Sequence, residues 1–310
     1  MRFIRHSTKS DWGLGVVTAE DATNLDILFE GIGYRKLAKS FQGLVDVAED
    51  DVPTDHGLRS QKAWPQIDRD GQRTQARRDL PKRFDGFLQE FLAQYPEGLL
   101  AKSCDEKERD AKVEACAFAQ AELTVAALDE LFASGGHAEI IQRTLRVLTK
   151  ASMAFPNELT KFRDVPEASQ KGVAERIVKL VKAGERTPEA LEALATALGP
   201  HGAAKWPVVS LIPFLLDPVR WPFVKPTFVE RAAKATGLDV EYDARPNART
   251  YSLVCDLYRD VAGALKARDV PPRDLIDVQT FLWIATGMAR EAQETQKARR
   301  DAKASAAKPA

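Results

Sequence analysis

The acidic side chains in the last third of the sequence have a spacing that suits metal-dependent chemistry. Asp239, Glu241 and Asp243 alternate along a segment that we predict to be extended, so their carboxylates would share one face. Asp274 and Asp277 lie close to one helical turn apart. Clustered carboxylates hold Mg²⁺ in nucleases, but the lysine that a nuclease motif adds two residues after an acidic residue is absent. Capping and surface roles also explain these acids, and we predict neither a catalytic residue nor a metal site.

Motifs for other kinds of catalysis are absent. The sequence contains no G-x-x-x-x-G-K-[ST] loop for nucleotide phosphates, no G-x-S-x-G nucleophile turn and no H-E-x-x-H zinc motif. Its four histidines are scattered. Its three cysteines lack C-x-x-C spacing and fit small buried apolar residues better than a disulfide framework or a zinc ribbon. We expect no cofactor.

A basic segment offers electrostatic binding instead. Between residues 59 and 83, eight lysines and arginines stand against three aspartates. On a helix, Arg69, Arg73 and Arg77 would form one stripe that follows a phosphate backbone. No aromatic side chain for base stacking interleaves this stripe, and a merely solvated face explains it equally well. The candidate nucleic-acid-binding residues are Arg69, Arg73, Arg77, Arg78, Lys82 and Arg83.

The pattern of the first 43 residues predicts a small β module. Short apolar alternations, bounded by glycines and polar turn residues, occur at residues 3–5, 13–18, 25–30 and 34–37. In the third of these, Leu25, Ile27 and Phe29 would point inward. Four or five strands this short bury a common face only by curling into a barrel-like sheet.

Three segments of this module follow the pattern of a known domain. Residues 11–17, 25–30 and 33–37 read Asp-Trp-Gly-Leu-Gly-Val-Val, Leu-Asp-Ile-Leu-Phe-Glu and Gly-Tyr-Arg-Lys-Leu. The pattern resembles the Tudor-like, SH3-type barrel at the C-terminus of UvrD/PcrA-type helicases, and related barrels of the CarD kind. The resemblance implies a barrel that docks on RNA polymerase, with nucleic-acid contact in some members. The sequence departs from the helicases because the barrel comes first and no motor precedes it.

The aromatic and basic residues of the module allow two kinds of binding. An aromatic cage for methylated cations would draw its rings from Phe3, Trp12, Phe29, Tyr34 and Phe41. A barrel of this size needs most of these rings for its own core, so we favour an exposed edge that pairs with a strand of a partner. The candidate partner-binding residues of this edge are Trp12, Tyr34, Arg35, Lys36 and Lys39.

Beyond the β module over residues 1–43, composition divides the chain into four further parts. Residues 44–83 predict a charged linker, whose prolines and glycines disfavour one continuous helix. From residue 84 the apolar period changes to that of a helix, which predicts a helical domain over 84–200. Prolines and tryptophans mark a second helical part over 201–289, and residues 290–310 predict a flexible basic tail.

The composition of the whole chain excludes several classes of protein. Its 310 residues hold 45 lysines and arginines against 45 acidic residues, so the net charge indicates no partner. A chain that is 44% hydrophobic and 29% charged is not wholly disordered, collagen-like or a disulfide scaffold. No apolar stretch approaches the roughly 20 residues that cross a bilayer, and the first residues lack the apolar region of a secretory signal. We expect a cytoplasmic protein that does not bind membranes.

Together these patterns predict an α+β protein, a small SH3-like or Tudor-like β barrel followed by a mainly α-helical body. The predicted function is non-enzymatic. The barrel docks the chain on a nucleoprotein machine, RNA polymerase or a DNA-repair assembly, while the body holds a second partner or DNA. The alternative is a nucleic-acid-binding or metal-dependent nucleic-acid-processing factor of a bacterial defence system, with a metal held by Asp239, Glu241 or Asp243.

Overall fold

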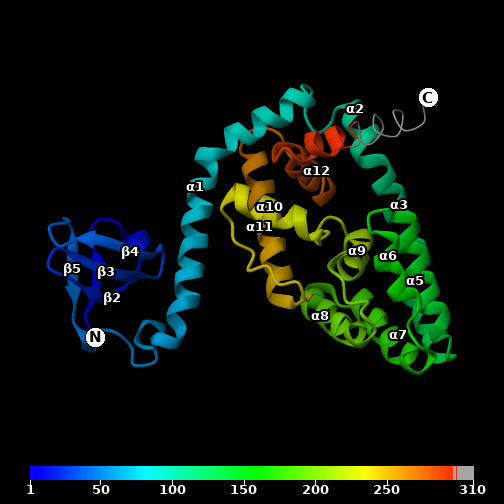
Figure 1. Cartoon of the computed structure of the whole chain (residues 1–310), viewed down its shortest axis with the longest axis horizontal. Coiled ribbons are helices and arrows are strands. Elements are labelled where there is room, and N and C mark those ends of the chain that lie inside the picture. Colours follow the sequence, from blue (N-terminus) through cyan, green and yellow to red (C-terminus); the bar gives the residue numbers. More distant parts are fainter. Residues whose placement is uncertain (296–297, 299–310) are drawn as a thin grey trace, which may run out of the picture. The chain divides into compact units, whose positions relative to one another are not determined.

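The computed structural model describes residues 1–295 and residue 298, and it has the predicted α+β arrangement of a β sheet followed by helices (Figure 1). The chain forms two compact units. The first comprises Met1–Arg83 together with Thr236–Asp239, and the second comprises Phe84–Ala235 and the described residues from Val240 onward. The predicted linker over 44–83 therefore belongs to the same unit as the sheet. The two predicted helical parts, 84–200 and 201–289, share the second unit apart from the short segment near residue 237.

A curled antiparallel sheet of five strands forms the centre of the first unit (Figure 1). The strands are β1 (Phe3–His6), β2 (Gly15–Glu20), β3 (Asn24–Phe29), β4 (Gly33–Ala38) and β5 (Leu44–Val47). Their order is β4-β3-β2-β1-β5, so β4 and β5 are the two edges. The first four strands overlap the predicted alternations. The fifth lies beyond the predicted end of the module at residue 43, where it pairs with β1.

The alternation in β3 points its residues toward two different faces of the sheet. Leu25, Ile27 and Phe29 are buried in one core cluster with Ile4 and Ile32, which confirms the predicted inner face. Leu28 lies between them in sequence, so its side chain points to the opposite face, and it is also fully buried. A sheet that is buried on both faces needs a second layer.

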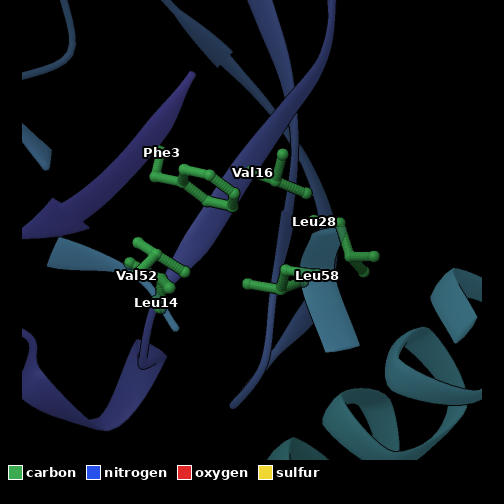
Figure 2. Packing of buried hydrophobic residues seen from close by; sticks show 6 residues of the cluster. All are labelled: Phe3, Leu14, Val16, Leu28, Val52 and Leu58. Carbon is green, nitrogen blue, oxygen red and sulfur yellow. The ribbon is translucent and has the colours of Figure 1, made fainter. Parts of the chain in front are cut away.

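The predicted linker supplies part of that second layer. Figure 2 shows the cluster that forms there, which consists of Phe3, Leu14, Val16, Leu28, Val52 and Leu58. Val52 directly follows the short 3₁₀ turn Glu49–Asp51, Leu58 lies in the next 3₁₀ turn, and Trp64 packs against the same cluster. The Trp64 Nε1 atom also donates to the Leu58 carbonyl oxygen at 2.8 Å. The segment predicted as a charged linker is therefore a packed part of the first unit, because its apolar residues cover the sheet.

Helix α1 (Trp64–Gln94) continues where prolines and glycines were expected to prevent a long helix. Pro81 lies inside it and removes only one backbone donor. Ala76, Leu80 and Phe84 are spaced four residues apart and are all buried, so packing of one apolar stripe holds the helix together through the proline. The boundary between the two units falls within this helix, between residues 83 and 84.

Short helices make up the rest of the second unit. They are α2 (Lys102–Cys104), α3 (Asp110–Glu122), α4 (Val125–Ala133), α5 (His137–Ala151), α6 (Pro156–Arg163), α7 (Glu167–Val181), α8 (Thr187–Leu198), α9 (Trp206–Leu216), α10 (Pro226–Thr236), α11 (Ala248–Lys266) and α12 (Leu275–Ala285). A π-helical turn over Asp105–Arg109 joins α2 to α3. Within the described residues, no helix is both long enough and apolar enough to cross a membrane.

The aromatic residues of the proline-rich part form a buried core. The Trp206 ring stacks on the Tyr251 ring at 6.4 Å between centroids, and the Trp206 Nε1 atom donates to the Asp243 carbonyl oxygen at 2.7 Å. The Tyr251 hydroxyl donates to the Pro222 carbonyl oxygen at 3.1 Å. Of the predicted flexible tail over 290–310, residues 290–295 are helical, and most of the remainder lies outside the described residues.

Candidate functional site

Strand β4 places three of the predicted partner-binding residues along one edge of the sheet. It pairs with β3, with Tyr34 opposite Leu28 and Lys36 opposite Asp26, and it lies at the end of the strand order. Tyr34 and Lys36 are exposed, whereas Arg35 between them is half-buried. An edge strand presents backbone N–H and C=O groups that the sheet does not satisfy, so these groups decide what the edge can bind.

Two hydrogen bonds fix which backbone groups of β4 face outward. The Tyr34 N–H donates to Asp68 Oδ1 at 2.8 Å, so it points away from β3. The Lys39 N–H donates at 2.8 Å to a carbonyl oxygen that precedes β3, so it points the other way. Because successive residues of a strand alternate between the two sides, the backbone groups of Lys36 and Ala38 face outward like those of Tyr34.

Some outward groups of β4 are already satisfied by the chain itself. The Tyr34 carbonyl oxygen accepts from the Arg35 guanidinium at 2.6 Å, and the Ala38 carbonyl oxygen accepts from the Phe41 N–H at 2.8 Å. Among the residues that the structure describes, the Lys36 N–H, the Lys36 carbonyl and the Ala38 N–H have no partner. The open part of the edge is therefore short and contains two donors and one acceptor.

The lysines of the edge are neutralised by neighbouring acids. The Lys36 ammonium lies 3.4 Å from Asp21 and 3.9 Å from Asp26, and the Lys39 ammonium lies 2.5 Å from Glu20. These side chains are all exposed to solvent, where ion pairs contribute little to stability. Their effect is to cancel the positive charge that the sequence suggested for this edge.

Asp68 is a residue of this site that sequence reasoning missed. Its carboxylate comes from α1 and occupies the first outward position of β4, at Tyr34. Burial raises the pKa of the Tyr34 hydroxyl, and the nearby Asp68 carboxylate adds to the increase. No spacing rule connects an aspartate on a helix with a strand 34 residues earlier, so the contact becomes visible only in the folded chain.

Trp12 lies in an aromatic cluster and not on β4. Its ring meets the His6 ring at 5.0 Å and the Phe29 ring at 5.1 Å, and it stacks on the Phe41 ring at 6.0 Å. The exposed Lys9 ammonium lies 4.4 Å from the centre of the Trp12 ring. The chain's own cation thus contacts these rings. The other two rings of the predicted cage lie elsewhere, on the second face of the sheet and on β4.

The predicted basic stripe on α1 is interrupted at its centre. Arg73 is only 6% exposed. Its Nε atom donates to the Asp239 carbonyl oxygen at 2.9 Å, and its Nη1 atom donates to Asp70 at 2.8 Å. Arg69 and Arg77, one turn before and after it, are exposed. Arg73 therefore acts inside the first unit and does not extend a cationic surface between its neighbours.

The other candidate nucleic-acid-binding residues of the basic segment divide in the same way. Arg78 donates to the Asp11 carboxylate at 2.9 Å, and Arg83 donates to the Thr236 carbonyl oxygen at 3.1 Å. Lys82 is exposed. The basic segment therefore combines arginines that stabilise the first unit with basic side chains that face solvent. The sequence alone does not distinguish the structural arginines from the exposed ones.

The acids that suggested a metal site do not alternate along a strand. Glu241 has a φ of 46°, in the left-handed region, which breaks the extended conformation between Asp239 and Asp243. The Glu241 carboxylate accepts from Arg249 at 2.8 Å, and Asp243 accepts from the Arg245 N–H at 2.8 Å. The prediction of an extended run with three carboxylates on one face was therefore wrong.

The second acidic pair is engaged by an arginine. Arg109 donates to Asp274 at 2.6 Å and to Asp277 at 2.9 Å. In the part of the chain that the structure describes, no group of three or more His, Cys, Asp or Glu side chains is arranged to hold a metal ion.

The three cysteines are buried and unreactive in character. Burial raises the pKa of Cys104 and of Cys116 to about 11, and that of Cys255 to about 12. Thiols with such values carry almost no thiolate near neutral pH. The interpretation of these residues as small apolar core residues is confirmed.

Comparisons with models of protein families, with curated proteins and with solved structures find no match to this chain.

Proposed function

We propose that the first unit is a docking module that accepts an extended segment of a partner protein along β4. The observation that supports this proposal is the set of three unpartnered backbone groups on the outward side of Lys36 and Ala38. An incoming strand would exchange two hydrogen bonds with Lys36 and accept a third from Ala38, which is the pattern of β-augmentation.

The strength of such docking follows from the shortness of the open edge. Three backbone hydrogen bonds contribute about 3 kcal/mol in total at about 1 kcal/mol each, which alone corresponds to an affinity weaker than about 1 mM. Side chains must supply the rest. Of the large exposed apolar side chains that the structure describes, the Tyr34 ring, 40% exposed, is the nearest to the open edge in sequence. Because the lysines here are already paired, we expect binding to depend only weakly on salt.

The partner that we propose is RNA polymerase or a DNA-repair assembly, with the helical body holding a second partner or DNA. This choice rests on the resemblance of residues 11–37 to Tudor-like, SH3-type barrels, and the curled five-stranded sheet is compatible with it. Metal-dependent nucleic-acid processing has less support, because Glu241 and Asp274 are ion-paired with arginines.

The experiment uses the immobilised full chain and two purified baits, bacterial RNA polymerase and a UvrD-type helicase, in biolayer interferometry. Lys36→Pro removes an outward N–H without breaking the ladder to β3, a position where an edge strand tolerates proline. Lys36→Thr removes the same ammonium but keeps the backbone donor, so it is the matched control. We expect the wild type and Lys36→Thr to bind one of the baits, and Lys36→Pro to bind it about tenfold more weakly or not at all.

Two results would contradict the proposal. Failure of the wild-type chain to bind either bait would remove the proposed partners, and equal binding by the proline and threonine variants would remove β4 as the docking surface. Thermal unfolding of both variants, followed by circular dichroism, shows whether a loss of binding reflects a loss of fold.

A further inference from the structure

Helices α7 and α8 of the helical unit form a hairpin with a groove on its surface. The two helices pack against each other and are joined by residues 182–186, a connection short enough to make them antiparallel neighbours. Residues of α7, of the connection and of the first two turns of α8 line the groove, whose volume is about 370 Å³. At about 30 Å³ for each water molecule, this space holds about twelve of them. The groove therefore accommodates a few side chains of a partner, and not a folded domain.

Four cationic side chains line this groove, two arginines and two lysines. Arg176 comes from α7, and Arg186 comes from the turn Gly184–Arg186 that precedes α8. Neither guanidinium group makes a hydrogen bond or an ion pair with any residue that the structure describes. Arg176 is half-buried, so it has lost part of its contact with water without gaining an acceptor from the protein. A carboxylate or phosphate group from outside the chain would supply that acceptor.

The two lysines of the groove are already paired with acids of the chain. The Lys179 ammonium lies 2.5 Å from the Glu175 carboxylate, one turn earlier on α7. The Lys182 ammonium pairs with the Asp129 carboxylate of α4. Ion pairs between exposed side chains contribute little to stability, so an incoming anion could replace these acids at small cost. The attraction of the groove for an anion nevertheless comes mainly from the two arginines.

The apolar part of the lining consists of three small side chains. Ala183, Ala190 and Ala193 line the groove, and all three are half-buried. Their methyl groups offer a surface on which an aliphatic side chain loses contact with water. Among the described residues that line the groove there is no aromatic ring, so it provides no platform on which a nucleic-acid base could stack.

One carboxylate of the chain also lines the groove. Glu189 lies in the first turn of α8, where the helix dipole favours a negative side chain. Its carboxylate makes no ion pair or hydrogen bond with any residue that the structure describes. A nucleic-acid strand carries a negative charge at every nucleotide and would bring one of them close to Glu189, whereas a peptide can place a neutral or basic residue there. The lining therefore favours a peptide over a nucleic acid.

We propose that the α7–α8 groove binds a short acidic segment of a partner protein, in which carboxylates flank aliphatic side chains. The carboxylates accept hydrogen bonds from Arg176 and Arg186, and the aliphatic side chains pack against the three alanines. This inference gives a site and a chemistry to the second partner of the helical body, and it rests on the proposed function in that respect alone. The groove lies entirely within the second unit, so binding there does not require the docking edge on β4.

The test measures fluorescence anisotropy of a labelled peptide, Glu-Asp-Glu-Leu-Leu-Glu-Asp-Glu, that is titrated with the full chain. A second peptide carries glutamine and asparagine in place of the acids, and a third carries serine in place of both leucines. We expect the first peptide to bind and the other two to bind at least about fivefold more weakly, because one loses charge-assisted hydrogen bonds and the other loses apolar burial. A single-stranded oligothymidylate should bind at least about tenfold more weakly than the first peptide.

Arg176→Gln is the decisive variant because it should fold normally. Its guanidinium group has no hydrogen bond or ion pair to lose within the described residues, so the thermal midpoint should stay close to that of the wild type. Binding of the acidic peptide should nevertheless weaken about fivefold to tenfold. Arg245→Gln is the matched control, since this exposed side chain is also without a partner among the described residues and does not line the groove. It should bind like the wild type.

A second pair of variants tests the shape of the groove without changing its charge. Ala190→Trp places a large ring in the groove and should weaken binding of the acidic peptide at least about tenfold. Thr196→Trp adds a similar ring at an exposed position of the same helix that does not line the groove, and it should bind like the wild type. Thermal unfolding followed by circular dichroism shows whether both variants keep their fold.

The proposal is overturned if the acidic peptide does not bind, if either altered peptide binds as well, or if the oligothymidylate binds as tightly or more tightly. It is also overturned if Arg176→Gln and Arg245→Gln bind the acidic peptide equally. Lys36→Pro should bind this peptide like the wild type, because the edge on β4 takes no part. A failure of the docking experiment would therefore leave the groove standing, and a failure of the groove would leave the docking edge.

Discussion

Asp277 is a carboxylate whose surroundings explain how the helical unit tolerates a buried charge. Its side chain is 3% exposed and accepts from Arg273 at 2.8 Å and from Arg109 at 2.9 Å. Arg273 also donates to Asp105 at 2.6 Å, and Arg109 to Asp274 at 2.6 Å. Two arginines and three aspartates thus form a network that connects the π-helical turn to the start of α12. Satisfied networks of this kind fix an arrangement of elements, while a broken one leaves a buried charge.

Replacing Arg273 by alanine should destabilise the protein. Asp277 would lose one of its two cations and remain buried, which we expect to lower the free energy of unfolding by about 2–4 kcal/mol, toward the lower part of the range for buried pairs because Arg273 is partly exposed. Urea denaturation measures the change. The control Arg259→Ala removes an exposed ion pair with Asp256 and should cost less than about 1 kcal/mol. Equal costs for the two variants would show that burial does not govern this network.

The same network predicts how stability depends on pH. The hydrogen bond from Arg273 lowers the pKa of Asp105 below its usual range, so this group contributes stability above its unfolded pKa and loses it as the pH falls through the folded value. The free energy of unfolding of the wild type should therefore decline below about pH 4. Arg273→Ala should show a shallower decline, and an identical pH profile for the two proteins would exclude this contribution.

At the scale of single elements, the contact between β4 and α1 is set by two glycines. A Cβ atom added at Gly71 would lie 2.3 Å from the backbone nitrogen of Gly33. Gly33 itself has a φ of +72°, and a Cβ atom there would lie 2.4 Å from Asp68 Oδ1. The helix therefore approaches the strand backbone directly, and this approach lets Asp68 reach the Tyr34 N–H.

Gly71→Ala should destabilise the first unit even though alanine favours helices. The added methyl group would force helix and strand apart, at a cost of about 1–3 kcal/mol. Gly86 lies in the same helix with no atom within 4 Å of an added Cβ, and Gly86→Ala should stabilise the protein by up to about 1 kcal/mol. The two thermal midpoints should move in opposite directions. A rise in both midpoints would contradict the close contact.

The elements differ in how far the sequence predicts them. The first four strands followed from alternation, because side chains in a strand change sides at every residue. The strand β5 and the cover over Leu28 did not, since their apolar residues do not alternate regularly and lie among five acidic residues and a proline between residues 44 and 58. The long helix α1 was obscured by Pro81, whose local cost is outweighed by the buried stripe around it.

At the scale of the whole molecule, composition predicted the class of fold but not the boundaries of its units. The edge at Tyr34 and Lys36 was predictable, because it depends on strand order in one local module. The hollow lined by Lys112, Ser152 and Thr280 was not, because its wall comes from four segments spread between residues 108 and 283, none with a distinctive motif. The role of Arg73 could not be predicted either. Arg73 donates to the backbone carbonyl oxygen of residue 239, and every residue type has such a carbonyl, so the sequence at residue 239 gives no sign of the contact.

The hydrogen bonds of Arg73 and Arg83 to distant carbonyl oxygens have a consequence for the order in which the protein folds on the ribosome. Arg73 and Arg83 donate to carbonyl oxygens 166 and 153 residues later in the chain. At roughly 5–20 residues per second, translation reaches those acceptors about 10–30 s after the arginines have been made. The nascent N-terminal unit therefore keeps these guanidinium groups hydrated, or in temporary contacts, until most of the polypeptide has been synthesised.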